Sequence, residues 1–287
     1  MKDIKVSVLI ANYNNEQYLT ECIDSIKKQT YQNVEIIIHD DSSSDNSIKR
    51  INKYKNIKII KNKKRGKYGS YNQMNAYNRA FKISNGEIIF LLDSDDLFKK
   101  NKIKNVINVF LKNKKISSLF DLPIYKYRNK LKFIKNKKKI ISNFWPYIPP
   151  QSCIAMKREE FNKIFKKINF NLFPDIWMDF RIGLYLKFIK KNFYVLDKNL
   201  TYYRQSEEMI SANFKFLSFA WWKRRKQAHD YVKYFFSKNN IRHLKNLDYL
   251  LTNNPSFSHV VCYFLIKNIL HNRELASVFS TRQMIKT

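Results

Sequence analysis

Glycine is scarce in this 287-residue sequence, and the scarcity excludes two kinds of nucleotide site. The glycines are Gly66, Gly69, Gly86 and Gly183. Neither G-x-G-x-x-G nor G-x-x-x-x-G-K-[ST] can be written with them, so both glycine-rich phosphate-binding loops are excluded. If the chain binds a nucleotide, other groups must neutralise its phosphates.

Cysteine and histidine are also sparse. Cys22, Cys153 and Cys262 are widely spaced and odd in number, so they form neither a disulfide framework nor a C-x-x-C site. We expect each to be a small buried hydrophobic residue in a reducing compartment. The 5 histidines never occur four residues apart with a glutamate between them, which excludes an H-E-x-x-H zinc helix.

Long hydrophobic runs are missing as well. The apolar run at residues 6–11 is too short for the core of a signal peptide. Residues 257–270 are interrupted by His259 and Lys267 and fall short of the ~18–20 residues that a membrane span needs. We therefore expect a cytoplasmic protein without a transmembrane helix.

Acidic residues are few: 23 Asp and Glu stand against 55 Lys and Arg, a formal charge of +32. An excess of this size predicts an anionic neighbour, such as phosphorylated ligands, nucleic acid or an anionic membrane surface. With 44% hydrophobic and 15% aromatic residues the chain can bury a core, which argues against a disordered basic tail.

Strand and helix patterns alternate through the first hundred residues. We expect strands at 6–10, 34–39, 57–60 and 88–92, with amphipathic helices between them. This alternation predicts an α/β fold with a mostly parallel sheet flanked by helices on both faces.

The later part of the chain has a different pattern. A helix with apolar positions from Ile182 precedes a short strand ending at Leu196, and Tyr202 begins an irregular stretch. From about Phe214 long amphipathic helices follow. We therefore divide the chain into a domain at 1–212 and a helical, basic and aromatic C-terminal region at 213–287.

Polar side chains follow three of the four predicted strands. Ligands of parallel α/β sheets bind beyond the carboxyl ends of the strands, so these residues are expected to meet at one rim. They are Asn12, Asp40, Asp41, Asp93, Asp95 and Asp96.

Asp93 and Asp95 are suited to a metal ion. On an extended backbone both carboxylates point to one side, and their repulsion favours a cation between them. Oxygen ligands without cysteine or histidine select Mg²⁺ or Mn²⁺, which could replace the missing glycine-rich loop on a diphosphate. The same pattern is also compatible with Asp93 capping the next helix while Asp95 and Asp96 are solvated.

An ordered set of motifs runs through the first hundred residues. The motifs are VSVLIANYN at 6–14, Tyr18-Leu19, Ser25-Ile26, QTY at 29–31, EIII at 35–38, DDSSSD at 40–45, NGEI at 85–88 and LDSDD at 92–96. Together they resemble the inverting family 2 glycosyltransferases with the GT-A fold. The resemblance is dense over the first hundred residues and extends more thinly to about residue 212.

The resemblance implies a role for each matching residue. Asp41 would accept a hydrogen bond from the uracil N3–H of a UDP-sugar, and Ala11 and Tyr13 would line the base pocket. Asp93 would bind the ribose or metal-bound water. Asp95 would hold the Mn²⁺ or Mg²⁺ on the diphosphate.

The catalytic base of the family is a later carboxylate that precedes an amphipathic helix. Residues 173–181, FPDIWMDFR, occupy that place. We favour Asp179, which directly precedes the helix whose apolar face begins at Ile182, and Asp175 is the alternative. Apart from the resemblance, an aspartate beside Trp177 and Phe180 is also compatible with a helix cap.

The sequence departs from the family at two places. Serines stand at 42 and 43 where glycine is frequent, and the YRQS segment at 203–206 lacks the histidine of the family's Tyr-Arg-x-His. Arg204 could still contact the diphosphate of the donor.

The implied function is transfer of a sugar from a nucleoside-diphosphate sugar to a hydroxyl of a glycan or lipid-linked glycan acceptor, with inversion. Two other classes remain open. One is a basic nucleic-acid-binding protein, which the charge suggests but no nucleic-acid module or basic stripe supports. The other is a membrane-surface scaffold with a degenerate transferase domain.

The C-terminal region begins with aromatic residues that run into a basic cluster. They are Phe214, Phe216, Leu217, Phe219, Trp221, Trp222, Lys223, Arg224, Arg225 and Lys226. Aromatic rings beside bases suit the headgroup level of an anionic bilayer, which predicts a peripheral protein on the inner face of the membrane. The same residues are also compatible with rings packed onto the protein and solvated bases.

Overall fold

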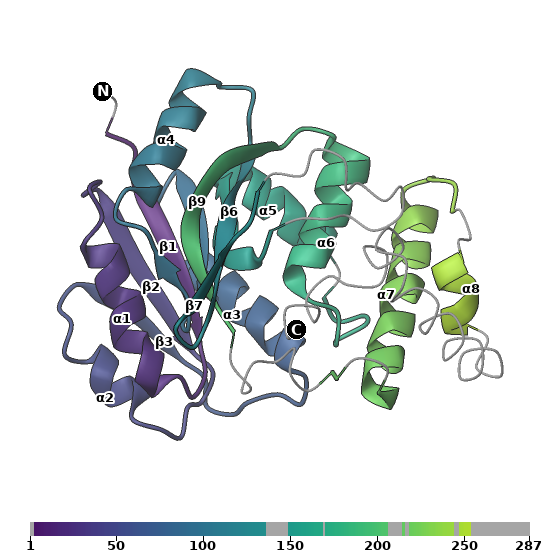
Figure 1. Cartoon of the computed structure of the whole chain (residues 1–287), viewed down its shortest axis with the longest axis horizontal. Coiled ribbons are helices and arrows are strands. Elements are labelled where there is room, and N and C mark those ends of the chain that lie inside the picture. Colours follow the sequence, from purple (N-terminus) through teal and green to yellow (C-terminus); the bar gives the residue numbers. More distant parts are fainter. Residues whose placement is uncertain are drawn as a thin grey trace. The chain divides into compact units, whose positions relative to one another are not determined.

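A computed structural model describes residues 3–135, 149–168, 170–205, 214–215, 218–243 and 247–253 (Figure 1). The chain divides into two compact units, one of Met1–Lys137 with Ile148–Glu208 and one of Lys138–Tyr147 with Met209–Thr287.

The first unit contains a mixed sheet with helices on both faces. Its strands are β1 (Val6–Asn12), β2 (Val34–Asp40), β3 (Ile57–Lys61), β4 (Ile88–Asp93), β5 (Leu97–Phe98), β6 (Ser118–Tyr127), β7 (Lys130–Phe133), β8 (Ile154–Lys157) and β9 (Tyr194–Arg204). Its helices are α1 (Glu16–Lys27), α2 (Ser47–Ile51), α3 (Gly69–Lys82), α4 (Lys102–Lys112), η1 (Gln151–Cys153), α5 (Arg158–Lys167), α6 (Met178–Leu184) and η2 (Tyr185–Lys190).

The strand order is β3-β2-β1-β4-β8-β6-β9-β5, with β7 paired to β6. The four strands that the sequence predicts are parallel neighbours, and this part of the prediction is confirmed. Their register places Ala11 between His39 and Asp93, so the carboxyl ends of β1, β2 and β4 reach the same rim. Beyond β4 the sheet continues through the antiparallel strand β8.

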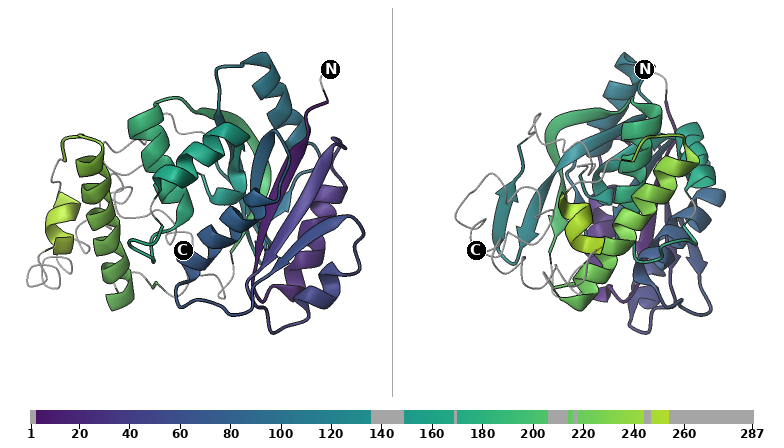
Figure 2. Two further views of the ribbon diagram at one scale, coloured as in Figure 1. Left: turned by 180° about the vertical axis from the view of Figure 1, so that it is seen from behind. Right: turned by 90° about the vertical axis from the view of Figure 1, so that its right-hand side faces the viewer.

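The helices cover the sheet because their apolar positions repeat at helical spacing. Figures 1 and 2 show α1 and α2 against one face and α3 against the other. Leu19 and Ile23 of α1 join Val8 and Ile10 of β1 in one buried core. Side chains alternate along a strand, and each fully buried one contributes about 1.5–3 kcal/mol to folding.

The expected end of the last strand is wrong. Strand β9 continues past Leu196 to Arg204, through the stretch beginning at Tyr202 that looked irregular. It pairs in parallel with β6. At a break in the register, the side-chain Nδ2 of Asn199 donates to the carbonyls of Pro123 and Ile134. This strand depends on a partner some 80 residues away, so local pattern does not reveal it.

Two of the three cysteines are as expected. Cys22 and Cys153 are buried free thiols, and burial raises the pKa of both. Cys262 lies outside the described residues.

The second unit contains α7 (Phe219–Lys238) and α8 (Leu247–Asn253). The long helix expected from about Phe214 begins at Phe219, where the Ser218 hydroxyl accepts from the Trp221 amide at 3.2 Å. Within the described ranges, no helix is both long enough and apolar enough to cross a membrane. Residues 216–217 of the aromatic segment and 254–287 are outside these ranges.

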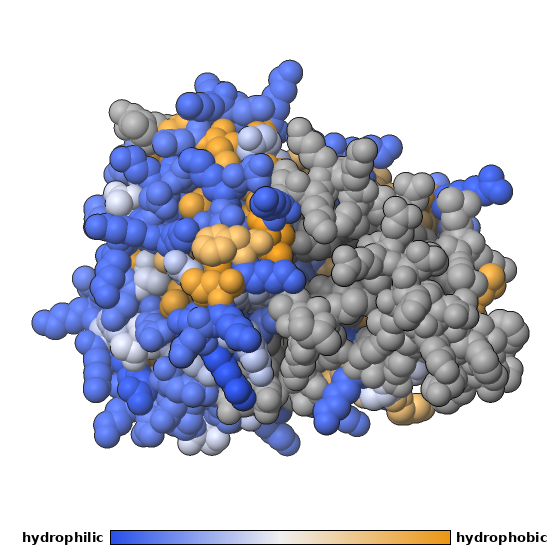
Figure 3. Space-filling view, viewed as in Figure 1, coloured by the Kyte–Doolittle hydropathy of each residue, from blue (hydrophilic) through white to orange (hydrophobic). Residues whose placement is uncertain are grey.

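The surface of the first unit matches the charge of the chain. Figure 3 shows it as largely hydrophilic in this view, with apolar residues gathered near β7 and β9. Among the exposed large hydrophobic residues of the described part are Leu131 and Phe133 of β7 and Tyr194 of β9.

Candidate active site

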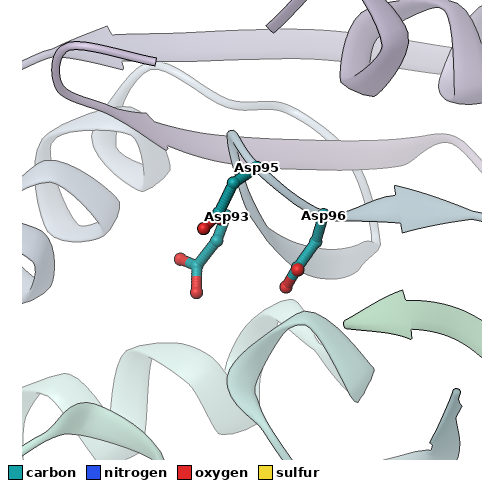
Figure 4. A group of neighbouring side chains, drawn as sticks. All are labelled: Asp93, Asp95 and Asp96. Atoms are coloured by element: carbon teal, nitrogen blue, oxygen red, sulfur yellow. The ribbon is translucent and has the colours of Figure 1, made fainter. Parts of the chain in front are cut away.

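The turn after β4 gathers three carboxylates. Asp93 ends the strand, and the side chains of Asp93, Asp95 and Asp96 each place an oxygen within 4.8 Å of the others (Figure 4). We call these residues the acidic turn. The turn is closed by the Asp96 amide, which donates to the Asp93 carbonyl at 3.0 Å.

Asp93 is held from two sides. From α3, Gln73 Nε2 and the Tyr77 hydroxyl donate to its Oδ1 at 2.8 and 2.7 Å. From η1, Gln151 Nε2 lies 2.6 and 2.8 Å from its two oxygens. Burial and the Asp93 charge raise the pKa of Tyr77 well above its usual value, so Tyr77 remains a neutral donor.

Asp96 is buried beneath the turn. It accepts from the Ser152 hydroxyl at 2.5 Å and from the Arg204 amide at 2.8 Å. Because both of its oxygens accept hydrogen bonds, Asp96 stabilises the turn. Within the described residues, Asp95 accepts no hydrogen bond from a side chain.

Two carboxyl groups of the acidic turn have raised pKa values. Burial first, and then the charge of Asp93, raise the pKa of Asp95 to about 7. Burial, then Asp95 and Asp93, raise that of Asp96 well above its usual value. Carboxylates this close ionise together only with a cation among them, and their oxygens are the ligands that Mg²⁺ and Mn²⁺ prefer. The residues present therefore fit a divalent ion.

Arg204 connects the acidic turn to α1. Its Nε donates to the Asp95 carbonyl at 2.8 Å, and its guanidinium pairs with Glu21 at 2.8 Å and lies 4.1 Å from the ring centre of Tyr18. The hydrogen bond from Arg204 lowers the pKa of Glu21. Arg204 thus lies beside Asp95, as a diphosphate ligand would require.

Asp41 follows β2 on the same rim and is buried. Its oxygens accept from Asn62 Nδ2 at 2.9 Å and Arg65 Nε at 3.2 Å, and the Arg65 guanidinium lies 3.4 Å from the ring centre of Tyr13. Tyr13 and Asp41 are therefore joined by one arginine. Ala11, half-buried in β1, separates them from the acidic turn, and its carbonyl accepts from the Ser94 amide.

The loops after β1 and β2 are tied together. Asn12 Nδ2 donates to Asp40 at 2.7 Å, and the Asn14 amide donates to the Ser43 hydroxyl at 2.9 Å. Ser42 has a φ of 63°. This is the left-handed region that glycine adopts without strain, so the serine at this position is held in a backbone conformation that the family's frequent glycine would adopt more easily.

The two base candidates have different surroundings. Asp179 lies in the first turn of α6, is buried, and its Oδ1 accepts from the Phe180 amide at 2.9 Å. Asp175 is half-buried in the preceding loop, and its carbonyl accepts from the Ser70 hydroxyl at 3.2 Å. Ser70 lies one helical turn before Gln73, which donates to Asp93. The loop that carries Asp175 therefore contacts the same helix that holds the acidic turn.

The loop that carries Asp175 is fixed by a buried arginine. Arg181 donates through its Nη2 to the carbonyls of Leu172 and Phe173 at 2.8 and 2.7 Å. It is fully buried. This support explains how Phe173 can hold a φ of 56°.

The structure thus brings Asp93, Asp95 and Arg204 into one cluster and Tyr13 and Asp41 into another on the same rim. The sequence analysis missed the residues that hold both. These are Gln73, Tyr77, Gln151, Ser152, Asn62 and Arg65. Polar side chains of this kind have no distinctive spacing, and the nearest signal is the Pro-Pro-Gln-Ser run at 149–152.

A family model described as Glycosyl transferase family 2 matches residues 7–181. Among curated proteins, the chain is 31% identical over 215 residues to an uncharacterized glycosyltransferase of Nostoc sp., covering 70% of this chain and 65% of that protein. It is 34% identical over 113 residues to the Escherichia coli UDP-Glc:alpha-D-GlcNAc-diphosphoundecaprenol beta-1,3-glucosyltransferase WfgD, covering 39% and 44%. The aligned part of the chain therefore spans less than two thirds of each relative.

A solved structure shares the fold. The crystal structure of Staphylococcus aureus TarS 1–349 in complex with UDP-GlcNAc has a TM-score of 0.59 and 20% identity, covering 89% of this chain and 73% of that one. This likeness confirms the predicted α/β, GT-A-type architecture.

Proposed function

The chain belongs to glycosyl transferase family 2, and from that membership we propose that it is a metal-dependent inverting glycosyltransferase. It would move a sugar from a UDP-sugar to a hydroxyl of a glycan acceptor in the synthesis of a surface polysaccharide, lipooligosaccharide or glycoconjugate. The observation that carries the proposal is the acidic turn, with an Asp95 pKa of about 7, on the same rim as the Tyr13–Asp41 pair.

Donor binding follows from the two clusters. Asp41 would accept from the base and Tyr13 and Ala11 would line its pocket, while Asp93 would face the ribose and Arg204 the diphosphate. Asp95, with Asp93, would hold Mn²⁺ or Mg²⁺, which when bound neutralises charge that develops on the departing diphosphate. Relatives named for UDP-glucose and bound to UDP-GlcNAc support the choice of uridine.

The transfer step needs a base. Asp179 would take the proton from the acceptor hydroxyl as its oxygen attacks the anomeric carbon in line, which inverts that centre. Asp175 is the alternative base. The name of WfgD supports inversion. It gives a UDP-Glc donor, whose glucose is α-linked to the diphosphate, and a beta-linked product.

Release of UDP tests this proposal. Purified protein with Mn²⁺ and an extract of lipid-linked glycans should release UDP from one UDP-sugar faster than from the others, and a chelator should stop the release. Release that is independent of both metal and donor would contradict it. Binding of nucleic acid as the main activity is not favoured, because the acidic turn repels phosphate without a cation.

The pH dependence of metal binding follows from the pKa of Asp95. Its value of about 7 lies above the ordinary value of 3.8, so the stability that the protonated carboxyl contributes to the metal-free fold is lost as the pH rises from about 4 to about 7. Metal binding requires the carboxylate, so Mn²⁺ affinity should fall by up to about tenfold per pH unit below pH 7.

Melting curves and calorimetric titrations between pH 5.5 and 8.5 measure both effects. Metal-free protein should melt at lower temperature as the pH rises to about 7, with no further loss from Asp95 above it, and added Mn²⁺ should reverse the loss. Asp95→Asn should flatten both dependences. A Mn²⁺ affinity that is constant from pH 6 to pH 8 would contradict the assignment.

We also propose that α7 docks a membrane surface, which would place the protein peripherally on the inner face, near a lipid-linked acceptor. Phe219 is 85% exposed at the start of the helix. Trp221 and Trp222 are half-buried in a T-shaped pair at 4.8 Å, and the Arg225 guanidinium lies 4.9 Å from the Trp221 ring. Rings and bases gathered at one helix end suit anionic headgroups, where each base contributes about 1 kcal/mol.

Changing Lys223, Arg224, Arg225 and Lys226 together to serine should therefore abolish co-sedimentation with anionic vesicles at low salt. Four exposed lysines of α4 and the loop after it provide a control of equal charge. They are Lys104, Lys112, Lys114 and Lys115. If both quadruple variants lose the same binding, or wild type binds no vesicles, α7 is not the docking surface.

A further inference from the structure

A buried ion pair lies in the first unit and has no part in the proposed reaction. Lys102, the first residue of α4, and Asp121 of β6 are both fully buried, with Nζ 2.7 Å from Oδ1. The Thr201 hydroxyl of β9 donates to the other Asp121 oxygen at 2.6 Å. Burial raises the pKa of Asp121, and the charge of Lys102 and its hydrogen bond oppose that rise.

Lys102 also donates hydrogen bonds to two other groups. Its Nζ donates to the Ser152 carbonyl and to the Thr201 hydroxyl, each at 2.6 Å. Its Nζ also lies 4.0 Å from the ring centre of Phe98, and the whole side chain is buried. Lys102 therefore fixes the backbone of Ser152.

Ser152 in turn holds the acidic turn. Its hydroxyl accepts from the Asp93 amide at 3.0 Å and donates to Asp96 at 2.5 Å. Ser152 is thus hydrogen-bonded to Lys102 through its carbonyl, and to both ends of the acidic turn through its hydroxyl.

Such a pair is costly to bury. Apolar residues of equal volume in place of a buried ion pair are often neutral or stabilising, so stability alone does not account for it. The acidic turn supplies a reason: its carboxylates repel one another, and a rigid support at Ser152 opposes their separation.

We propose that Lys102 is a positioning residue for the metal site, which through Ser152 holds the acidic turn in the geometry that binds a divalent ion. The inference rests on the proposed function, because it assumes that the acidic turn binds metal. Residues that orient metal ligands typically change metal affinity by about 10–100-fold when they are replaced.

The test separates positioning from stability. Lys102→Met alone leaves Asp121 buried and unpaired, so the informative variant is Lys102→Met with Asp121→Asn, which removes both charges and keeps their volume. Lys102→Gln with Asp121→Asn restores a donor toward the Ser152 carbonyl. Ser152→Ala keeps the ion pair and removes the hydroxyl. The control is Lys58→Met, which breaks the ion pair between Lys58 of β3 and Glu35 of β2, two residues outside the acidic turn.

The readouts are the melting temperature without metal and the Mn²⁺ dissociation constant in the presence of UDP. The Met/Asn variant should melt close to wild type and bind Mn²⁺ about 10–100-fold more weakly, as should Ser152→Ala. The Gln/Asn variant should recover part of the affinity, and Lys58→Met should bind as wild type does.

The outcomes distinguish the two proposals. Wild-type affinity in a well-folded Met/Asn variant overturns the role of Lys102 and leaves the transferase proposal intact. If the double variants do not fold, wild-type affinity in Ser152→Ala overturns it instead. If wild type itself binds no Mn²⁺ with UDP, both proposals fail.

Discussion

Replacing Asp95 with alanine is expected to lower sugar transfer by at least about a thousandfold and to remove the Mn²⁺ dependence of UDP binding. Loss of a metal that stabilises a leaving diphosphate removes several kcal/mol of transition-state stabilisation, and about 4 kcal/mol corresponds to a thousandfold in rate. Steady-state UDP release and calorimetry with and without Mn²⁺ measure the two effects.

A carboxylate outside the acidic turn controls for charge and folding. Asp24 of α1 accepts from the Tyr54 hydroxyl at 2.9 Å, so Asp24→Ala loses a hydrogen bond but no proposed ligand. It should retain wild-type metal dependence. Near wild-type turnover by Asp95→Ala in saturating Mn²⁺ would refute the metal assignment.

Asp179→Asn should retain donor and Mn²⁺ binding and lose about 10²–10⁴-fold in kcat, because a general base acts only in the transition state. The asparagine is isosteric, and its oxygen can still accept from the Phe180 amide as Asp179 does at 2.9 Å. Donor affinity from calorimetry and kcat from UDP release give the required separation.

Asp175→Asn is the matched comparison. Asp175 is half-buried beside the start of α3, whereas Asp179 is buried in α6. If Asp175→Asn loses kcat with donor binding intact and Asp179→Asn does not, Asp175 is the base. Loss of donor binding in both variants would contradict a base at either position.

The parts of the fold that the sequence predicts are those with local causes. Strands β1 to β4 and helices α1 to α3 follow from apolar spacing, and parallel pairing follows from their alternation. Strand β9 was predicted too short, because its last residues are ordered by pairing with β6. The division at residue 212 and the base assignment stay predictions.

The same contrast holds for the site. Aspartates that end strands β2 and β4 could be placed on one rim from sequence, because parallel strands end together. Their partners could not: Ser152 meets Asp96 across 56 residues, and Thr201 meets Asp121 across 80. Lys102 and Asp121 gave a weak signal, since each is a charged residue beside apolar positions of its element.

The central claim, a uridine-selective and metal-dependent donor site, is tested most directly by thermal shift with UDP, GDP, CDP and ADP, each with Mn²⁺ or chelator. At 100-fold excess over the dissociation constant a ligand stabilises by about 2.7 kcal/mol, so UDP with Mn²⁺ should raise the melting temperature by about 5–10 °C. The other diphosphates, and UDP with chelator, should give clearly smaller shifts. Equal shifts with all four nucleotides, or a UDP shift that chelator leaves unchanged, would contradict the account.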